Sequence, residues 1–139
     1  EFLIDLHILV DPEMTVTEGH RVAEIVRRNL IKAFDNIQNV LVHVDGELDS
    51  EVETLYPVTR KELTRIVRTL ITELDESISQ AEIRVHHIQG KNFVDVFIKV
   101  RSEQTIGDYH ALVANIRSKL ETAPQIDQAL VFLDLNSLN

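Results

Sequence analysis

The sequence predicts a mixed α+β protein in which a β-α-β arrangement is followed by an α-β-β-α-β arrangement. Some segments have apolar residues at every second position, as in strands, and others have them at helical spacing. The two kinds of segment follow one another along the chain. A weak internal repeat relates the start of the chain to its second half. The length of 139 residues suits one compact domain or two small modules packed together.

The first module opens with a predicted strand over residues 2–10. The residues on its expected core face are Phe2, Ile4, Leu6, Ile8 and Val10, and those on its other face are Leu3, Asp5, His7 and Leu9. Thr15 or Thr17 is the candidate cap of the helix that follows. The apolar stripe of that helix consists of Val22, Ile25, Val26, Leu30 and Ala33. Residues 40–45 form the second predicted strand.

The second module begins with a helix from about Thr59. Strands over 81–88 and 93–100 follow, joined as a hairpin through Gly90-Lys91-Asn92. A helix over 106–121 and a strand over 128–135 complete it. The acidic stretch between the modules is a linker candidate, so the predicted organisation is a first module at 1–48, a linker at 49–58 and a second module at 59–139.

The internal repeat places LIDLHILVDPEMTVTEGH over FVDVFIKVRSEQTIGDYH. In this alignment His20 meets His110, and with one residue deleted Asp45 meets Asp134. The second copy is complete, whereas the first lacks an opening helix and strand. We therefore expect a truncated first module and a degenerate second one.

Composition excludes several classes of function. The formal net charge of −9 argues against nucleic acid and against direct binding to anionic lipid, because both require clustered Lys and Arg. The chain has no cysteine, which excludes disulfides and thiolate zinc sites. No apolar run approaches the ~18 residues of a membrane-spanning helix. No nucleophile motif or phosphate-binding glycine loop is present, so we expect no enzyme.

Histidines and an aspartate in the first module form a candidate metal site. His43 and Asp45 lie two residues apart, so both side chains occupy one strand face. His7 lies on the corresponding face of the other strand, and His20 lies near the helix start, away from the apolar stripe. Imidazole and carboxylate groups suit zinc, manganese, iron or cobalt. The alternative is that the four are unrelated surface residues.

The second module provides an internal comparison for that alternative. Phe97 replaces His7 and Phe132 replaces His43, so the fold tolerates the loss of both imidazoles. This favours a metal site in the first module. His86 and His87 are adjacent, so they point to opposite faces of a strand, and we interpret them as surface or hairpin residues.

The run DLHILVDPEMTVTEGHRVAEIVRRNL, followed by NVLVHVD, resembles the C-terminal domain of the cation diffusion facilitator family. Members carry a strand of the form H-x-x-V-D-P-x-M, a helix that opens E-A-H and a closing strand V-x-V-H-x-D-P; here Gly46 stands in place of the last proline. The resemblance covers about Phe2 to Asp45, and the second module matches only as a fold pattern.

That resemblance implies an αββαβ, ferredoxin-like fold, similar to copper metallochaperones. It also implies a cytoplasmic domain of an integral membrane protein, for which we expect the bacterial inner membrane, with the transmembrane part upstream. Homodimerisation through this domain and a metal ion near the dimer interface are further implications. His7, His20, His43 and Asp45 fall on the family's ligand positions.

The resulting expectation is a regulatory domain of a divalent-cation efflux transporter. Metal, with zinc the leading candidate, would report the cytosolic concentration and stabilise the active dimer. A purely structural dimerisation domain and a small-molecule-sensing ferredoxin-like module remain as alternatives.

Overall fold

The computed structural model describes residues 2–47, 58–101 and 103–135. The chain divides into two compact units, unit 1 at Glu1–Glu53 and unit 2 at Thr54–Asn139. The element order is β-α-β in unit 1 and α-β-β-α-β in unit 2, with one added short 3-10 helix, which confirms the predicted α+β class. Almost the whole predicted linker at 49–58 lies outside the described residues.

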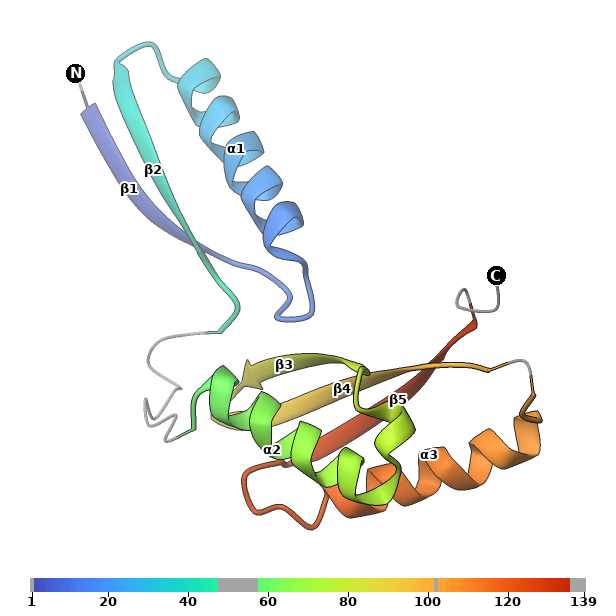
Figure 1. The fold of residues 1–139 in the computed structure, drawn as a ribbon. Helices are drawn as coiled ribbons and strands as arrows, with labels where there is room; N and C mark the ends of the chain where they lie inside the picture. Colours follow the sequence, from blue (N-terminus) through green and yellow to red (C-terminus); the bar gives the residue numbers. More distant parts are fainter. Residues whose placement is uncertain (1, 48–57, 102, 136–139) are drawn as a thin grey trace. The chain divides into compact units, whose positions relative to one another are not determined.

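Unit 1 is a parallel pair of strands with one helix beside it (Figure 1). Its elements are β1 (Phe2–Leu9), α1 (Val16–Ala33) and β2 (Ile37–Asp45). The β1 residues Ile4, Leu6 and Ile8 are half-buried while their neighbours are exposed, as the alternation predicts. Since α1 packs against β2 on one face of the strand pair, the alternate residues of the strands remain on the other face.

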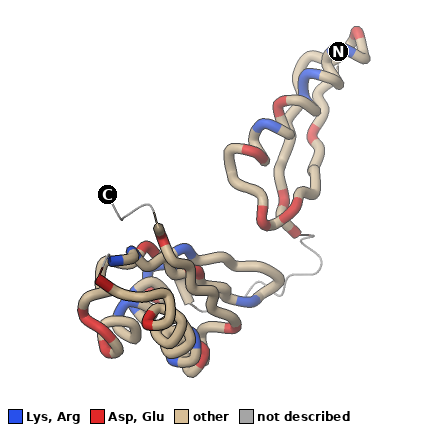
Figure 2. The backbone as a smooth tube through the Cα atoms, turned by 90° about the vertical axis from the view of Figure 1, so that its right-hand side faces the viewer, with Lys and Arg blue, Asp and Glu red and all other residues tan. Residues whose placement is uncertain are grey.

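Helix α1 begins at the first of the two candidate caps. Thr15 caps it, accepting a hydrogen bond from the Glu18 backbone N–H, while the Glu18 carboxylate accepts bonds from Thr15. Figure 2 marks both acidic and basic positions along unit 1, and those of the helix include Glu18, Arg21 and Glu24.

The predicted apolar stripe of α1 was wrong at two positions. Ile25 is 49% exposed and Ala33 is exposed, whereas Gly19 and Ala23 are buried. Successive residues of an α-helix are rotated by about 100° around the helix axis. Ile25 follows Ala23 by two residues and therefore lies on nearly the opposite side of the helix. The small side chains allow close contact, since a Cβ on Gly19 would lie 3.2 Å from Val44 Cγ1.

Unit 2 packs two helices against one face of a three-stranded sheet (Figure 1). Its elements are α2 (Arg60–Leu74), the 3-10 helix η1 (Glu76–Ile78), β3 (Glu82–Ile88), β4 (Lys91–Lys99), α3 (Ile106–Leu120) and β5 (Gln128–Asp134). The strand order is β3-β4-β5, with β3 antiparallel and β5 parallel to β4. The core is aliphatic, and its fully buried members include Leu63, Val67, Ile71, Val94, Val96, Ile98, Ile116 and Leu120.

The predicted hairpin connection through Gly90-Lys91-Asn92 was wrong at two residues. The turn consists of Gln89 and Gly90, both with positive φ (50° and 73°), while Lys91 and Asn92 already belong to β4. A two-residue turn with both central residues at positive φ matches the twist of a hairpin, and this allows the strands to pair up to the turn. Among the described residues, no helix is long and apolar enough to cross a membrane.

Candidate metal centre

His7 and His43 lie side by side on neighbouring strands of unit 1. The parallel register pairs His7 of β1 directly with His43 of β2. Their rings stack, with centroids 4.6 Å apart and planes inclined by 11°. Strand pairing therefore fixes the spacing of the two imidazoles, and both rings remain open to solvent on the face opposite α1.

Each imidazole is in contact with one carboxylate. His7 Nδ1 lies 2.7 Å from Asp45 Oδ2, within hydrogen-bond distance. His43 Nε2 lies 3.4 Å from Asp5 Oδ1. Both contacts connect the two strands, because each histidine meets the aspartate of the neighbouring strand.

Three of these side chains can offer one donor atom each to a single ion. The donor atoms of Asp5, His7 and His43 lie within 4.8 Å of one another. Two imidazole nitrogens and carboxylate oxygen make a borderline donor set, suited to zinc and also to manganese, iron or cobalt. All three residues are exposed, so the group is open to solvent.

The structure brings together three of the four residues singled out from the sequence. His7, His43 and Asp45 lie in contact, whereas His20 is exposed on α1 and does not belong to the three-residue group. Asp5 was missed as a candidate, although it precedes His7 by two residues and shares its strand face. That spacing was the available signal, since it is the same spacing that selected Asp45 beside His43.

Unit 2 carries an aromatic pair at the corresponding place. Phe97 of β4 pairs directly with Phe132 of β5, again between parallel strands. Their rings stack at 4.9 Å with planes inclined by 15°. The Arg84 guanidinium lies 4.5 Å from the centre of the Phe97 ring. The same position in the repeat therefore holds an imidazole pair in unit 1 and an apolar pair beside a cation in unit 2.

His86 and His87 hold the β3–β4 hairpin together instead of forming a joint site. His86 Nε2 lies 3.0 Å from Asp95 Oδ2, and His87 Nδ1 lies 2.7 Å from Asn92 Oδ1. Both histidines are half-buried. Their opposite directions along β3 agree with the expectation for adjacent strand residues.

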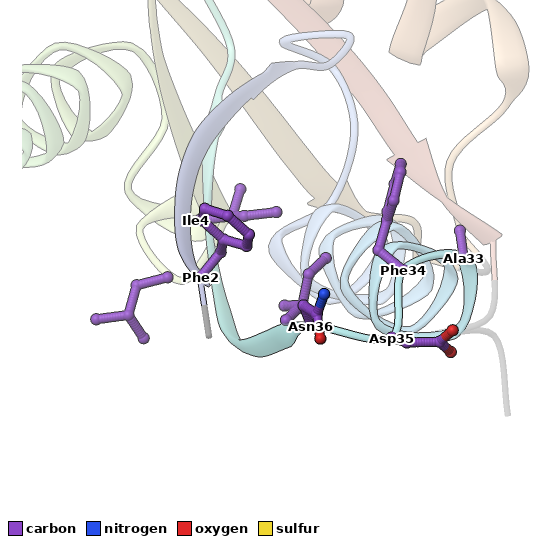
Figure 3. Close-up of a pocket in the computed structure, with 8 residues that line it drawn as sticks. Phe2, Ile4, Ala33, Phe34, Asp35 and Asn36 are labelled. Atoms are coloured by element: carbon purple, nitrogen blue, oxygen red, sulfur yellow. The ribbon is translucent and has the colours of Figure 1, made fainter.

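A mostly apolar pocket of unit 1 is separate from the histidine pair. It lies at the other end of the strands, where Phe2 and Ile4 of β1 face Ala33, Phe34, Asp35 and Asn36 (Figure 3). Its volume is about 590 Å³. Its lining is mostly apolar and contains no histidine, so it offers no comparable metal donors.

Comparison with known proteins gives a family match over unit 1. Residues 1–47 match the family described as the cytoplasmic domain of cation efflux proteins. This agrees with the resemblance found in the run from Phe2 to Asp45. The description of that family is of one domain of a cation efflux protein.

Two individual proteins are similar over longer stretches. Metal tolerance protein C1 of Arabidopsis thaliana is 24% identical over 147 aligned positions, which cover 96% of this chain and 31% of that protein. The chain therefore spans about a third of the length of this relative. The solved structure named MamM-CTD 215-293 is 17% identical, with a TM-score of 0.39, and the match covers 51% of this chain and 96% of that chain.

Proposed function

We propose, because residues 1–47 match the family of cation efflux cytoplasmic domains, that this chain senses a divalent metal ion and regulates an efflux transporter. The ion binds at the His7–His43 face of unit 1. Binding favours a closed homodimer of the domain, and that dimer favours the active arrangement of a membrane part elsewhere in the transporter. Zinc is the leading candidate ion.

The observation that supports this proposal most strongly is the registered imidazole pair. Strand pairing holds His7 and His43 side by side, and a carboxylate contacts each ring. A surface histidine without a function needs no such neighbours. In unit 2 the equivalent strands carry Phe97 and Phe132, so the fold itself does not require imidazoles there.

A single copy of unit 1 supplies too few donor atoms to complete a tetrahedral or larger coordination shell. His7 and His43 supply two nitrogens, and Asp5 or Asp45 supplies oxygen. Since His20 is exposed on α1 and outside this group, we propose that it completes the site of a second copy. Ligands drawn from two copies would couple metal binding to dimerisation.

The charge of the chain makes a second contribution that also favours the dimer when metal is bound. The chain carries a formal net charge of −9, so two copies repel each other in the absence of cations. Bound divalent ions reduce that repulsion, and salt screens it. A metal ion shifts the dimer equilibrium only by its differential affinity for the two states. The bridging ligand is what would supply that difference.

A purely structural dimerisation domain is the alternative that the surface favours. Unit 1 exposes large apolar side chains, among them Phe2, Leu3 and Leu9, and such surfaces often mark interfaces.

The small-molecule-sensing alternative has less support. The start of α1 would have to receive an anion, but Glu18 occupies it, and hydrogen bonds from Thr15 hold the pKa of that carboxyl below its ordinary value.

Metal titration combined with light scattering distinguishes a metal-sensing domain from a purely structural dimerisation domain (a scaffold). Zinc chloride, and separately manganese chloride, would be titrated calorimetrically into the chain while molar mass is recorded. We expect saturable binding and a shift toward dimer on loading. The His20→Ala variant should bind more weakly and lose the metal-dependent dimer.

The matched control is His110→Ala, which removes the histidine at the repeat position of unit 2 and should leave both readouts unchanged. A dimer of constant mass and no saturable heat would favour the scaffold. Binding that His20→Ala leaves intact would contradict the shared site.

A further inference from the structure

The two histidine–aspartate contacts of unit 1 differ in length, and the difference separates their roles. His7 Nδ1 and Asp45 Oδ2 are 2.7 Å apart, a distance typical of a charge-assisted N–H···O bond. His43 Nε2 and Asp5 Oδ1 are 3.4 Å apart, beyond the usual 2.7–3.2 Å range of such bonds. The first pair is therefore a hydrogen bond, whereas the second is a longer contact.

The longer contact has the length expected between two ligand atoms of one metal ion. Zinc–nitrogen and zinc–oxygen bonds measure about 2.0–2.1 Å, so two ligand atoms of a tetrahedral site lie about 3.3 Å apart. The 3.4 Å separation of His43 Nε2 and Asp5 Oδ1 fits this edge. The 2.7 Å separation at His7 and Asp45 is too short for two atoms bound to one tetrahedral ion.

The short contact also fixes which nitrogen of His7 can bind metal. A ring that donates its Nδ1 proton to Asp45 presents Nε2 as its lone-pair nitrogen. In metal sites, a carboxylate that accepts the second ring N–H orients the imidazole and raises its basicity. Asp45 is in position for that role. Asp5 belongs to the group whose donor atoms converge with those of His7 and His43.

We propose that Asp5 is the carboxylate ligand of the ion and that Asp45 is a positioning residue that acts through His7. This inference rests on the proposed metal-binding function and deepens it. It also reassigns Asp45, which the sequence pattern selects as a ligand. Asp45 holds the His7 ring by its Nδ1–H, while His7 Nε2, His43 Nε2 and Asp5 Oδ1 face the ion.

The repeat offers matched control positions for both aspartates. Asp95 corresponds to Asp5, and Asp134 corresponds to Asp45. Both lie in unit 2, where the strands carry Phe97 and Phe132 in place of the histidines. Changing them removes the same charge from the same place in the repeat without touching the proposed site.

The first test compares zinc affinities of the full chain with Asp5→Asn, Asp45→Asn, Asp95→Asn and Asp134→Asn. Asp5→Asn should abolish saturable binding at zinc concentrations that saturate the unaltered chain. Asp45→Asn should keep the site with roughly 10–100-fold lower affinity, the usual cost of losing an outer-shell partner. The two unit 2 variants should bind like the unaltered chain.

The second test reads the ligating nitrogen directly. Cadmium-113 added to the chain with nitrogen-15 histidine should show a scalar coupling to Nε2 of His7 and none to Nδ1. In Asp45→Asn the coupling should weaken or move to a mixture of ring nitrogens, which a merely structural role for Asp45 would not cause. A coupling to Nδ1 of His7 in the unaltered chain would overturn the assignment.

The outcomes separate the two levels of the proposal. If the unaltered chain binds no zinc, the metal-sensing function fails and this inference fails with it. If it binds zinc and Asp5→Asn retains that binding while Asp45→Asn loses it, the metal function stands and the division of roles is overturned.

Discussion

At the scale of single residues, the His7–His43 face of unit 1 consists of side chains whose positions are set by the strand backbone. His7 and His43 are directly paired, so neither ring needs a loop to approach the other. Sites on regular elements are more precise than sites on loops. The spacing of the donors should therefore change little when metal binds, and most of the reorganisation should fall on the open side.

Thr59 offers a residue-scale prediction about stability. Its side chain accepts a hydrogen bond from the Glu62 N–H and donates one to the Glu62 carboxylate. Thr59→Ala should lower the free energy of unfolding of unit 2 by about 1 kcal/mol at pH 7, as for other helix caps. Denaturant unfolding measures this. Thr69→Ala, an exposed position in the middle of the same helix, should change it by less than about 0.5 kcal/mol.

The same cap predicts a pH dependence with a defined sign. Hydrogen bonds from Thr59 hold the pKa of Glu62 below its ordinary value of 4.5. A depressed pKa in the folded state adds stability above the unfolded pKa, and that stability is lost as the pH falls through the folded pKa. Unfolding measured from pH 6 to pH 3 should show this loss, and Thr59→Ala should make it smaller. An equal pH slope in both proteins would contradict the assignment.

Residue types and alternation predicted which strand faces carry the candidate site residues, but not the contacts between them. The period-two pattern placed His7 and His43 on non-core faces, and the structure agrees. It could not give the direction of pairing or the register, because those depend on contacts between distant segments. Without the register, the contact of Asp5 with His43 could not be seen. For a helix residue such as His20, the sequence likewise predicts only the face of the helix and not the residues that it contacts.

At the scale of elements, α3 provides a matched pair of isoleucines. Ile116 is fully buried in unit 2, whereas Ile106 at the start of the same helix is 85% exposed. Ile116→Ala should lower the free energy of unfolding by about 2–5 kcal/mol, because it removes buried methylene groups and leaves a cavity. Ile106→Ala should cost far less. Thermal or denaturant unfolding of both variants tests this, and equal losses would show that α3 does not pack as described.

Element boundaries were predicted best where side chains define them. The capping threonines Thr15, Thr59 and Thr105 each precede an acidic residue by three positions, and the structure begins a helix after each. The turn at Gln89-Gly90 was placed too late, since Gly90 alone does not reveal which residues flank it. The 3-10 helix η1 was missed, because three residues are too few to show a period.

At the scale of the whole molecule, the two units differ in how much apolar surface they bury. Among the described residues of unit 1, the buried apolar side chains are Ala23 and Val40, whereas unit 2 buries a continuous aliphatic cluster. Since buried apolar area is the main source of stability, unit 1 should be the less stable of the two. The stabilisation by a ligand that binds unit 1 would therefore be a larger fraction of that unit's total stability.

Hydrogen exchange tests that asymmetry. Zinc at 100 times its dissociation constant should stabilise the unit that binds it by about 2.7 kcal/mol. We expect slower amide exchange in β1 and β2 after zinc is added, with little change in β3, β4 and β5. Magnesium chloride at the same ionic strength controls for screening of the acidic chain. Protection that rises equally in both units would place the metal effect outside the proposed site.

The most direct test of the central claim replaces His7 and His43 with the residues that unit 2 carries at the same positions. The His7→Phe/His43→Phe double variant should keep the fold, because Phe97 and Phe132 stack between equivalent parallel strands. Calorimetric titration with zinc would be measured on this variant and on the unaltered chain, with circular dichroism to verify folding. The account predicts saturable zinc binding by the unaltered chain and none by the folded double variant. Unchanged zinc affinity in the folded double variant would contradict it.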